Sequence, residues 1–162
     1  ESELSDDVAY DTPRPEGFDV LLKDYRLSPG LAGYDFSTYS VGQYNGQYTD
    51  IFFEYYNGEY YMDVWEDSDI QDVGYTTSLY DIGKAPVEGW SPAKDVRLIV
   101  GHTYIVWTWD NHFAKVRITA LSSTRVVFDW AYQLQNGNTR LKRAIPIERG
   151  RLQMGSGVSG RM

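Results

Sequence analysis

The dipeptide Asn-Gly occurs three times, at Asn45-Gly46, Asn57-Gly58 and Asn136-Gly137, each time between runs rich in aromatic or apolar residues. Both central positions of a type I′ turn need a positive φ angle, which Asn and Gly tolerate better than other residues. Each pair therefore predicts a tight hairpin. No segment keeps the 3.6-residue apolar spacing of an amphipathic helix. The sequence accordingly favours antiparallel strands over helices.

The hairpin around Asn57-Gly58 can be aligned residue by residue. Phe53 then faces Met62, and one face of the hairpin is wholly apolar. The opposite face is aromatic and acidic, and its candidate binding residues are Phe52, Tyr56, Tyr61 and Trp65. Three interpretations of this face stay open: a buried layer of a sandwich, a platform that stacks on sugar rings, or a contact between subunits.

The other strands follow from the same alternation. Asn45-Gly46 is expected to join residues 34–44 to the first hairpin, and a second meander covers 97–109, 113–121, 126–135 and 138–145. Its first turn, at residues 110–111, places Trp109 opposite His112. Glycines and prolines between residues 67 and 90 exclude a long helix there. We predict an all-β fold, an antiparallel β-sandwich or a partly open barrel of about eight strands.

Composition fits one folded domain, with 162 residues, 15% aromatic residues, 23% charged residues and a net charge of -8. Residues 1–19 hold seven acidic residues and one arginine, whereas residues 140–162 hold six basic residues and one glutamate. We divide the chain into an acidic arm at 1–19, a β-domain at 20–145 and a Gly/Ser/Arg tail at 146–162. The acidic balance disfavours nucleic acid as a partner.

Several classes of protein are excluded. The chain has no cysteine, and therefore no disulfide, thiolate catalysis or iron–sulfur cluster. No apolar run reaches the roughly 20 residues that cross a bilayer, and the first residues do not resemble a signal peptide, so we expect a soluble or already processed chain. Motifs such as Gly-x-Ser-x-Gly, the P-loop and His-Glu-x-x-His are absent. We therefore expect no enzymatic activity.

A metal site is considered at two places. Five carboxylates follow the first hairpin closely: Asp63, Glu66, Asp67, Asp69 and Asp72. They suit a calcium ion, although their order lacks the spacing of an EF-hand, and a solvated acidic loop is the alternative. His102 and His112 are too far apart along one hairpin to share a metal.

Residues 101–118 and 126–133 resemble a pattern found in secreted and lipid-anchored β-proteins of bacterial envelopes. In that pattern a strand ending near a Thr-x-Asp-Gly-x-Tyr-Ala-Lys turn precedes a strand that closes in aromatic-x-Tyr-Gln. Haem-binding lipoproteins of Bacteroidetes contain it, and residues 50–51 and 85–90 are also similar to their sequence. Across residues 34–135 the resemblance implies a β-fold and an extracellular or cell-surface location. Asn111 and His112 replace the usual turn glycine, and no pair of histidines matches haem ligands.

These features predict first an extracellular, non-enzymatic subunit that self-assembles into a filament or surface layer. Residues 140–147 or 18–22 would add as a strand to an open edge of another copy, with Leu141, Ile145 or Leu22 filling pockets. The alternative is a surface module that binds a ligand, a glycan first and haem second. A third interpretation makes the basic segment 140–151 a contact for an anionic envelope polymer.

Overall fold

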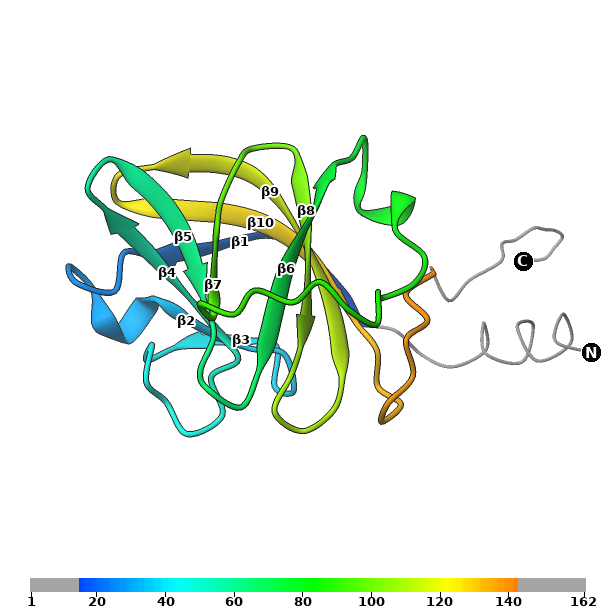
Figure 1. Ribbon diagram of the computed structural model, residues 1–162. Coiled ribbons are helices and arrows are strands. Elements are labelled where there is room, and N and C mark those ends of the chain that lie inside the picture. The colour runs from blue at the N-terminus through cyan, green and yellow to red at the C-terminus, as the bar shows by residue number, and fades with distance from the viewer. Residues whose placement is uncertain (1–14, 143–162) are drawn as a thin grey trace, which may run out of the picture.

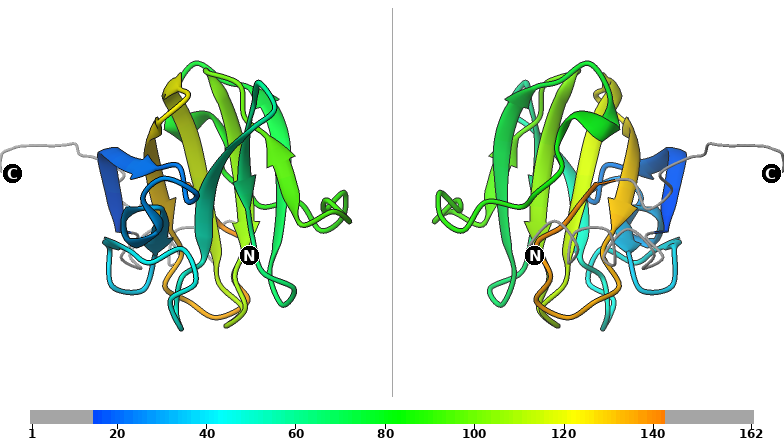
Figure 2. Two further views of the ribbon diagram at one scale, coloured as in Figure 1. Left: turned by 90° about the vertical axis from the view of Figure 1, so that its left-hand side faces the viewer. Right: turned by 90° about the vertical axis from the view of Figure 1, so that its right-hand side faces the viewer.

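A computed structural model describes residues 15–142 of the chain. These residues form two antiparallel five-stranded sheets that pack together as a β-sandwich and do not close into a barrel (Figures 1 and 2). The predicted all-β sandwich is confirmed. The described residues contain more strands than the eight or so expected, because the strands predicted at 34–44 and 97–109 are each divided in two and a further strand forms at Asp69–Tyr75.

Sheet A has the order β1-β10-β9-β8-β6 and sheet B the order β3-β2-β4-β5-β7. The strands of sheet A are β1 (Glu16–Lys23), β6 (Asp69–Tyr75), β8 (His102–Trp107), β9 (Phe113–Ser122) and β10 (Arg125–Tyr132). Those of sheet B are β2 (Gly33–Asp35), β3 (Ser40–Gly42), β4 (Ile51–Tyr56), β5 (Glu59–Asp63) and β7 (Asp95–Arg97). Two short 3-10 helices, η1 (Pro29–Leu31) and η2 (Leu79–Asp81), lie in the connections.

The main core lies between the sheets and follows from the alternation of side chains along each strand. On β10 the alternate residues Val126, Phe128, Trp130 and Tyr132 are all buried in it. Sheet B contributes the apolar face of the first hairpin, which includes Phe53. A second, smaller core covers the outer face of sheet A and contains Ala85, Ile105, Phe113 and Leu141. Both faces of sheet A are therefore partly buried.

The hairpin at Asn57-Gly58 is confirmed in register. Tyr56 pairs with Glu59 and Phe53 with Met62, as the type I′ turn requires. Asn57 and Gly58 have φ angles of 53° and 84°, both in the left-handed region that this turn needs.

The hairpin predicted at Asn45-Gly46 is wrong. The chain turns earlier, between β2 and β3, where the Asp35 carboxylate accepts a hydrogen bond from the Ser37 backbone N–H at 2.8 Å. Such a side-chain turn needs no Asn-Gly pair. Strand β2 therefore lies between β3 and β4, and Asn45-Gly46 falls in a loop.

The strand predicted at residues 97–109 is divided between the two sheets. Strand β7 belongs to sheet B and β8 to sheet A, and Gly101 between them has a φ of 91° that a residue with a side chain rarely adopts. Trp107 pairs with Phe113. This register differs by one residue from the predicted one, in which Trp109 lies opposite His112. His112 therefore lies opposite Thr108, and Trp109 projects from the loop. Strand β6 was not predicted.

Residues 18–22, and residues 140–142 of the second segment assigned to strand addition, are engaged within their own chain. Residues 18–22 belong to β1, which pairs with β10, so the predicted boundary at residue 20 cuts through a strand. Of the strand predicted at residues 138–145, the structure describes residues 138–142, and their β-pairing there is one bridge between Arg140 and Lys84. Leu141 is 1% exposed in the second core, and its backbone N–H donates to the Gly83 carbonyl at 2.9 Å. Ile145, the outer arm 1–14 and the tail 146–162 lie outside the described residues.

Candidate functional site

Several loops gather at one end of the sandwich, the lower end in Figure 1. Three of them form a cleft. The loop after β3 contributes Tyr48, and the β8–β9 loop contributes Trp109. Trp65, two residues after the end of β5, also lines the cleft. The cleft encloses about 520 Å³ and is completed by polar groups: Asn45, Gln47, Thr49 and Asp67, with the backbone of Gly46. It therefore combines aromatic faces with amide, hydroxyl and carboxylate groups.

The aromatic rings of the cleft are exposed, and each packs on at least one other ring. Tyr48 and Trp109 stack on each other with ring centroids 6.0 Å apart, and they are 51% and 43% exposed. Trp65 is 40% exposed and packs on Phe52 at 5.1 Å. Tyr44 stacks on the same indole at 6.3 Å. Such support holds the rings in place while their outer faces stay accessible to a ligand.

The predicted binding residues of the first hairpin fall into separate places. Trp65 lines the cleft, and Phe52 is 7% exposed and supports it from beneath. Tyr56 lies at the far end of β4, where the Arg26 guanidinium covers its ring at 5.0 Å. Tyr61 is half-buried in β5. Tyr48 and Trp109 were missed, because only the sheet order brings their loops next to Trp65.

A buried carboxyl group, Asp50, follows Thr49 of the cleft in sequence. It is 3% exposed, and its Oδ2 accepts a hydrogen bond from the Phe36 backbone N–H at 2.8 Å. Burial raises the pKa of Asp50 to about 7, and the nearby charges of Asp35, Asp110 and Asp67 act in the same direction. This end of the sandwich therefore carries a carboxyl group that titrates near neutrality.

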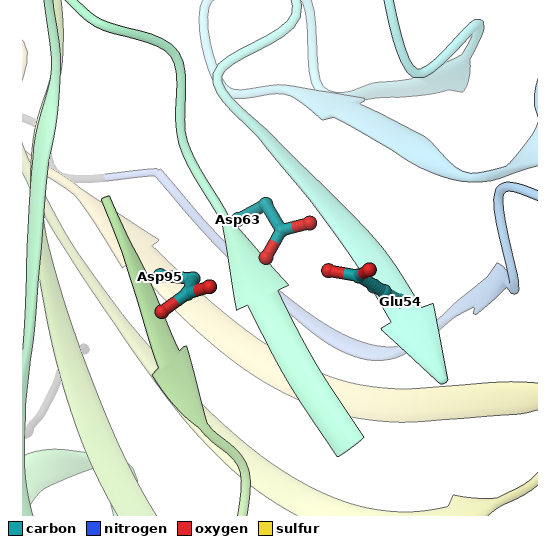
Figure 3. A group of neighbouring side chains, drawn as sticks. All are labelled: Glu54, Asp63 and Asp95. Carbon is teal, nitrogen blue, oxygen red and sulfur yellow. The ribbon is translucent and has the colours of Figure 1, made fainter. Parts of the chain in front are cut away.

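The outer face of sheet B brings together three carboxyl groups that the sequence did not connect. Glu54, Asp63 and Asp95 come from β4, β5 and β7, and one oxygen of each lies within 4.8 Å of the others (Figure 3). Burial, and then Glu54, raise the pKa of Asp63 to about 9. Oδ1 of Asp63 is buried without a hydrogen-bond partner. Arg26 forms an ion pair with Glu54 at 2.7 Å.

The five carboxylates predicted as a calcium site are not gathered in one place. Asp63 belongs to the cluster with Glu54 and Asp95, whereas Asp69 forms an ion pair with Lys94 at 3.0 Å. Asp72 contacts His102, and Glu66 and Asp67 are exposed in the loop before β6. Among residues 15–142, the three outer carboxyls are the only group of this kind close enough to share an ion. Calcium binding by the predicted set stays a prediction.

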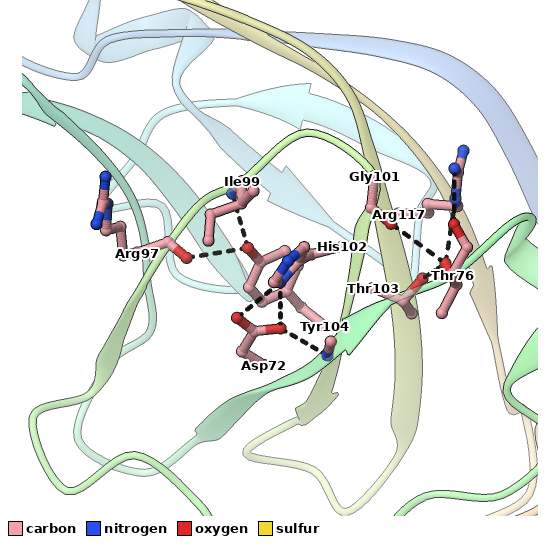
Figure 4. Close-up of polar contacts among 10 residues, drawn as sticks. Asp72, Thr76, Arg97, Ile99, Gly101, His102, Thr103, Tyr104 and Arg117 are labelled. Atoms are coloured by element: carbon pink, nitrogen blue, oxygen red, sulfur yellow. Dashed lines mark hydrogen bonds and ion pairs between the residues drawn. The ribbon is translucent and has the colours of Figure 1, made fainter.

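The two histidines lie at opposite ends of the β8–β9 hairpin. The Asp72 carboxylate contacts Nδ1 of His102 at 2.9 Å, within a polar network on β6 and β8 (Figure 4). In the same region Arg117 donates to the Thr76 carbonyl at 3.0 Å and holds the segment after β6 against sheet A. The other histidine, His112, has its Nδ1 2.9 Å from the Gln133 carbonyl. Their separation agrees with the expectation that they share no metal.

The described residues also line two further cavities, one of which adjoins the cleft. The first encloses about 360 Å³, shares Asp67 and Trp109 with the cleft, and also contains Asp69, Trp107, Thr108 and Asn111. The second encloses about 640 Å³ and is lined by basic and small residues: Gly83, Lys84, Gly137, Asn138, Thr139, Arg140 and Lys142. The backbone N–H of Gly137, which lines the second cavity, donates to the carbonyl of Asn111, which lines the first, at 2.7 Å.

Comparisons with known proteins found no related protein. The chain matches no family, no curated protein and no solved structure. In the part of the chain that the structure describes, no helix has the length and apolar character needed to cross a bilayer.

Proposed function

We propose that this protein is a glycan-binding module whose ligand stacks on Trp65, Trp109 and Tyr48. The single observation that carries this proposal is the convergence of three exposed rings from separate loops on one cleft. Large aromatic side chains rarely stay this exposed in such a group without a partner. The extracellular location expected from the sequence is compatible with this role, and it remains a prediction.

The chemistry of the cleft matches a sugar. A pyranose ring presents apolar C–H groups on its faces and hydroxyl groups at its edges, so it needs aromatic surfaces flanked by polar groups. Asn45, Gln47, Thr49 and Asp67 provide amide, hydroxyl and carboxylate partners around the rings.

The test is a glycan array that holds neutral and acidic oligosaccharides, followed by titration of the bound glycans monitored by tryptophan fluorescence. Trp65→Ala and Trp109→Ala should each weaken binding about tenfold, because an aromatic contact contributes about 0.5–1.5 kcal/mol beyond the area that it buries. Tyr75→Ala is the matched control, since Tyr75 is 73% exposed next to His102, at the other end of β8. Binding to no glycan, or equal effects of all three variants, would overturn the proposal.

Self-assembly, the first prediction from the sequence, stays a prediction. Residues 18–22 and Leu141 are engaged in the sheet and core of their own chain. Exchange of these segments between copies would therefore have to replace contacts already made within one chain. Light scattering over a wide concentration range would test association, and a strict monomer would count against it.

Haem is the second ligand that the sequence analysis predicts. Because His102 and His112 lie at opposite ends of their hairpin, the two imidazoles cannot face each other across one haem group within a single chain. Haem binding stays a prediction, and the aromatic and polar lining of the cleft leads us to place a glycan first.

A further inference from the structure

The aromatic cleft and the cavity that adjoins it are lined by carboxylates. Asp67 and Trp109 line both of them, and Asp69 lines the adjoining cavity. The Asp110 carboxylate accepts a hydrogen bond at 2.5 Å from the hydroxyl of Thr108, another lining residue of that cavity. Among residues 15–142, no lysine or arginine lines either space. The charge beside the exposed rings is therefore negative.

Asp67 is the carboxylate of this group that is available to a ligand. It is exposed, and it forms no ion pair with any residue that the structure describes. Asp69, by contrast, forms an ion pair with Lys94 at 3.0 Å, and the same ammonium group donates to the Ser68 carbonyl at 2.7 Å. The lysine next to the adjoining cavity is therefore already engaged, whereas the charge of Asp67 is not balanced by it.

The buried Asp50 carboxyl group responds to the same negative charges. It follows Thr49 of the cleft in sequence. Burial is the main reason for its raised pKa, and the charges of Asp35, Asp110 and Asp67 raise that pKa further. Charges that oppose a further negative charge at Asp50 also oppose an anionic ligand in the neighbouring cleft, and they attract a cationic one.

A cation is also what the exposed rings can bind. An ammonium group over the face of a Trp or Tyr ring is attracted to it by about 0.5–1 kcal/mol at an exposed site. Trp65, Trp109 and Tyr48 offer such faces in the cleft. An amino sugar carries its protonated amine at the edge of a ring whose C–H groups stack on aromatic side chains. One ligand can therefore use both the rings and the carboxylate.

We propose that the preferred ligand is a cationic glycan with free amino groups, whose sugar ring stacks on Trp65 and Trp109 while a protonated amine binds the Asp67 carboxylate. This inference rests on the proposed function and specifies its ligand class. Acetylation of the amine removes its charge, so a neutral N-acetylated glycan stacks on the same rings and binds more weakly. A glycan with a carboxylate on every sugar is repelled.

The experiment measures binding of four hexamers by calorimetry in mildly acidic buffer: the glucosamine hexamer, which has an amine on every sugar; chitohexaose, in which each amine is acetylated; hexagalacturonate, which is anionic; and hexalysine, which is cationic but has no sugar ring. We expect the glucosamine hexamer to bind most tightly, at least about threefold more tightly than chitohexaose. Raising the salt concentration from about 0.05 M to about 0.5 M should weaken its binding and change that of chitohexaose little.

Variants of Asp67 test the role of its charge. Asp67→Asn should weaken binding of the glucosamine hexamer about three- to fivefold and bring its affinity close to that of chitohexaose. Asp67→Lys should weaken binding of the glucosamine hexamer further. Glu59→Gln is the matched control, since it removes the same charge at the first residue of β5, at the opposite end of this strand from Trp65. The control should keep the preference for the glucosamine hexamer.

The outcomes separate this inference from the proposed function. The cationic ligand is overturned, and the glycan-binding module survives, if Trp65→Ala weakens binding but the Asp67 variants keep the wild-type preference. The same conclusion follows if chitohexaose, hexagalacturonate or hexalysine binds as tightly as the glucosamine hexamer, or if Glu59→Gln has the effect of Asp67→Asn. If the Trp variants have no effect, or if no glycan on the array or among these hexamers binds, both proposals fail.

Discussion

At the scale of single residues, the carboxyl groups decide how stability responds to pH. The pKa of Asp50 is raised from 3.8 to about 7, so the native state keeps a proton that the unfolded chain has already lost in this interval. The free energy of unfolding must therefore fall as pH rises from 3.8 to about 7. Asp50→Asn should remove this part of the decline, measured by urea unfolding at a series of pH values.

Asp63 provides the internal comparison, since its pKa is raised to about 9. The decline in the free energy of unfolding that Asp63 causes therefore extends beyond neutral pH. Asp63→Asn should make the free energy of unfolding depend less on pH between pH 7 and about 9. Asp50→Asn should leave the pH dependence in this interval unchanged. Identical pH profiles for the wild type and both variants would show that neither carboxyl group holds its proton in the native state.

At the scale of elements, the fit of β1 against β10 depends on the absence of a side chain at Gly17. A methyl group at this position would overlap the indole of Trp130, which is 3% exposed in the main core. Gly17→Ala should lower the free energy of unfolding by about 1–3 kcal/mol, because the core cannot accommodate the added volume without moving. Gly42→Ala in β3 is the control, since a methyl group there meets nothing within 4 Å. Equal stability of the two variants in chemical unfolding would contradict this packing.

At the scale of the whole molecule, Leu141 distinguishes a self-contained sandwich from an assembling one. It is 1% exposed in the core that covers the outer face of sheet A. Leu141→Ala should therefore destabilise the protein by about 2–5 kcal/mol and leave its sedimentation unchanged. The control is Leu134→Ala, which is 39% exposed and should change stability by less than about 0.5 kcal/mol. A Leu141→Ala variant with unchanged stability and reduced association would instead place this side chain in another copy.

Sequence and tertiary structure decided different parts of this protein. Near neighbours in the chain decide the turn at Asn57-Gly58 and the buried alternation of Phe128 and Trp130, and these features were predicted correctly from the sequence. Asn45-Gly46 has the same two residues but no hairpin, since the Asp35 side chain had already turned the chain.

The cleft could not be predicted in full. The alternation in the first hairpin identified Trp65 as a candidate binding residue. Trp109 was placed one residue out of register, and Tyr48 was not predicted as a binding residue. Only the tertiary structure brought these rings together, and it alone placed Lys84 beside Arg140 and Asp63 beside Asp95. The physical reason is that such contacts depend on which strands become neighbours and where distant loops end, and alternation along a single strand carries no information about either.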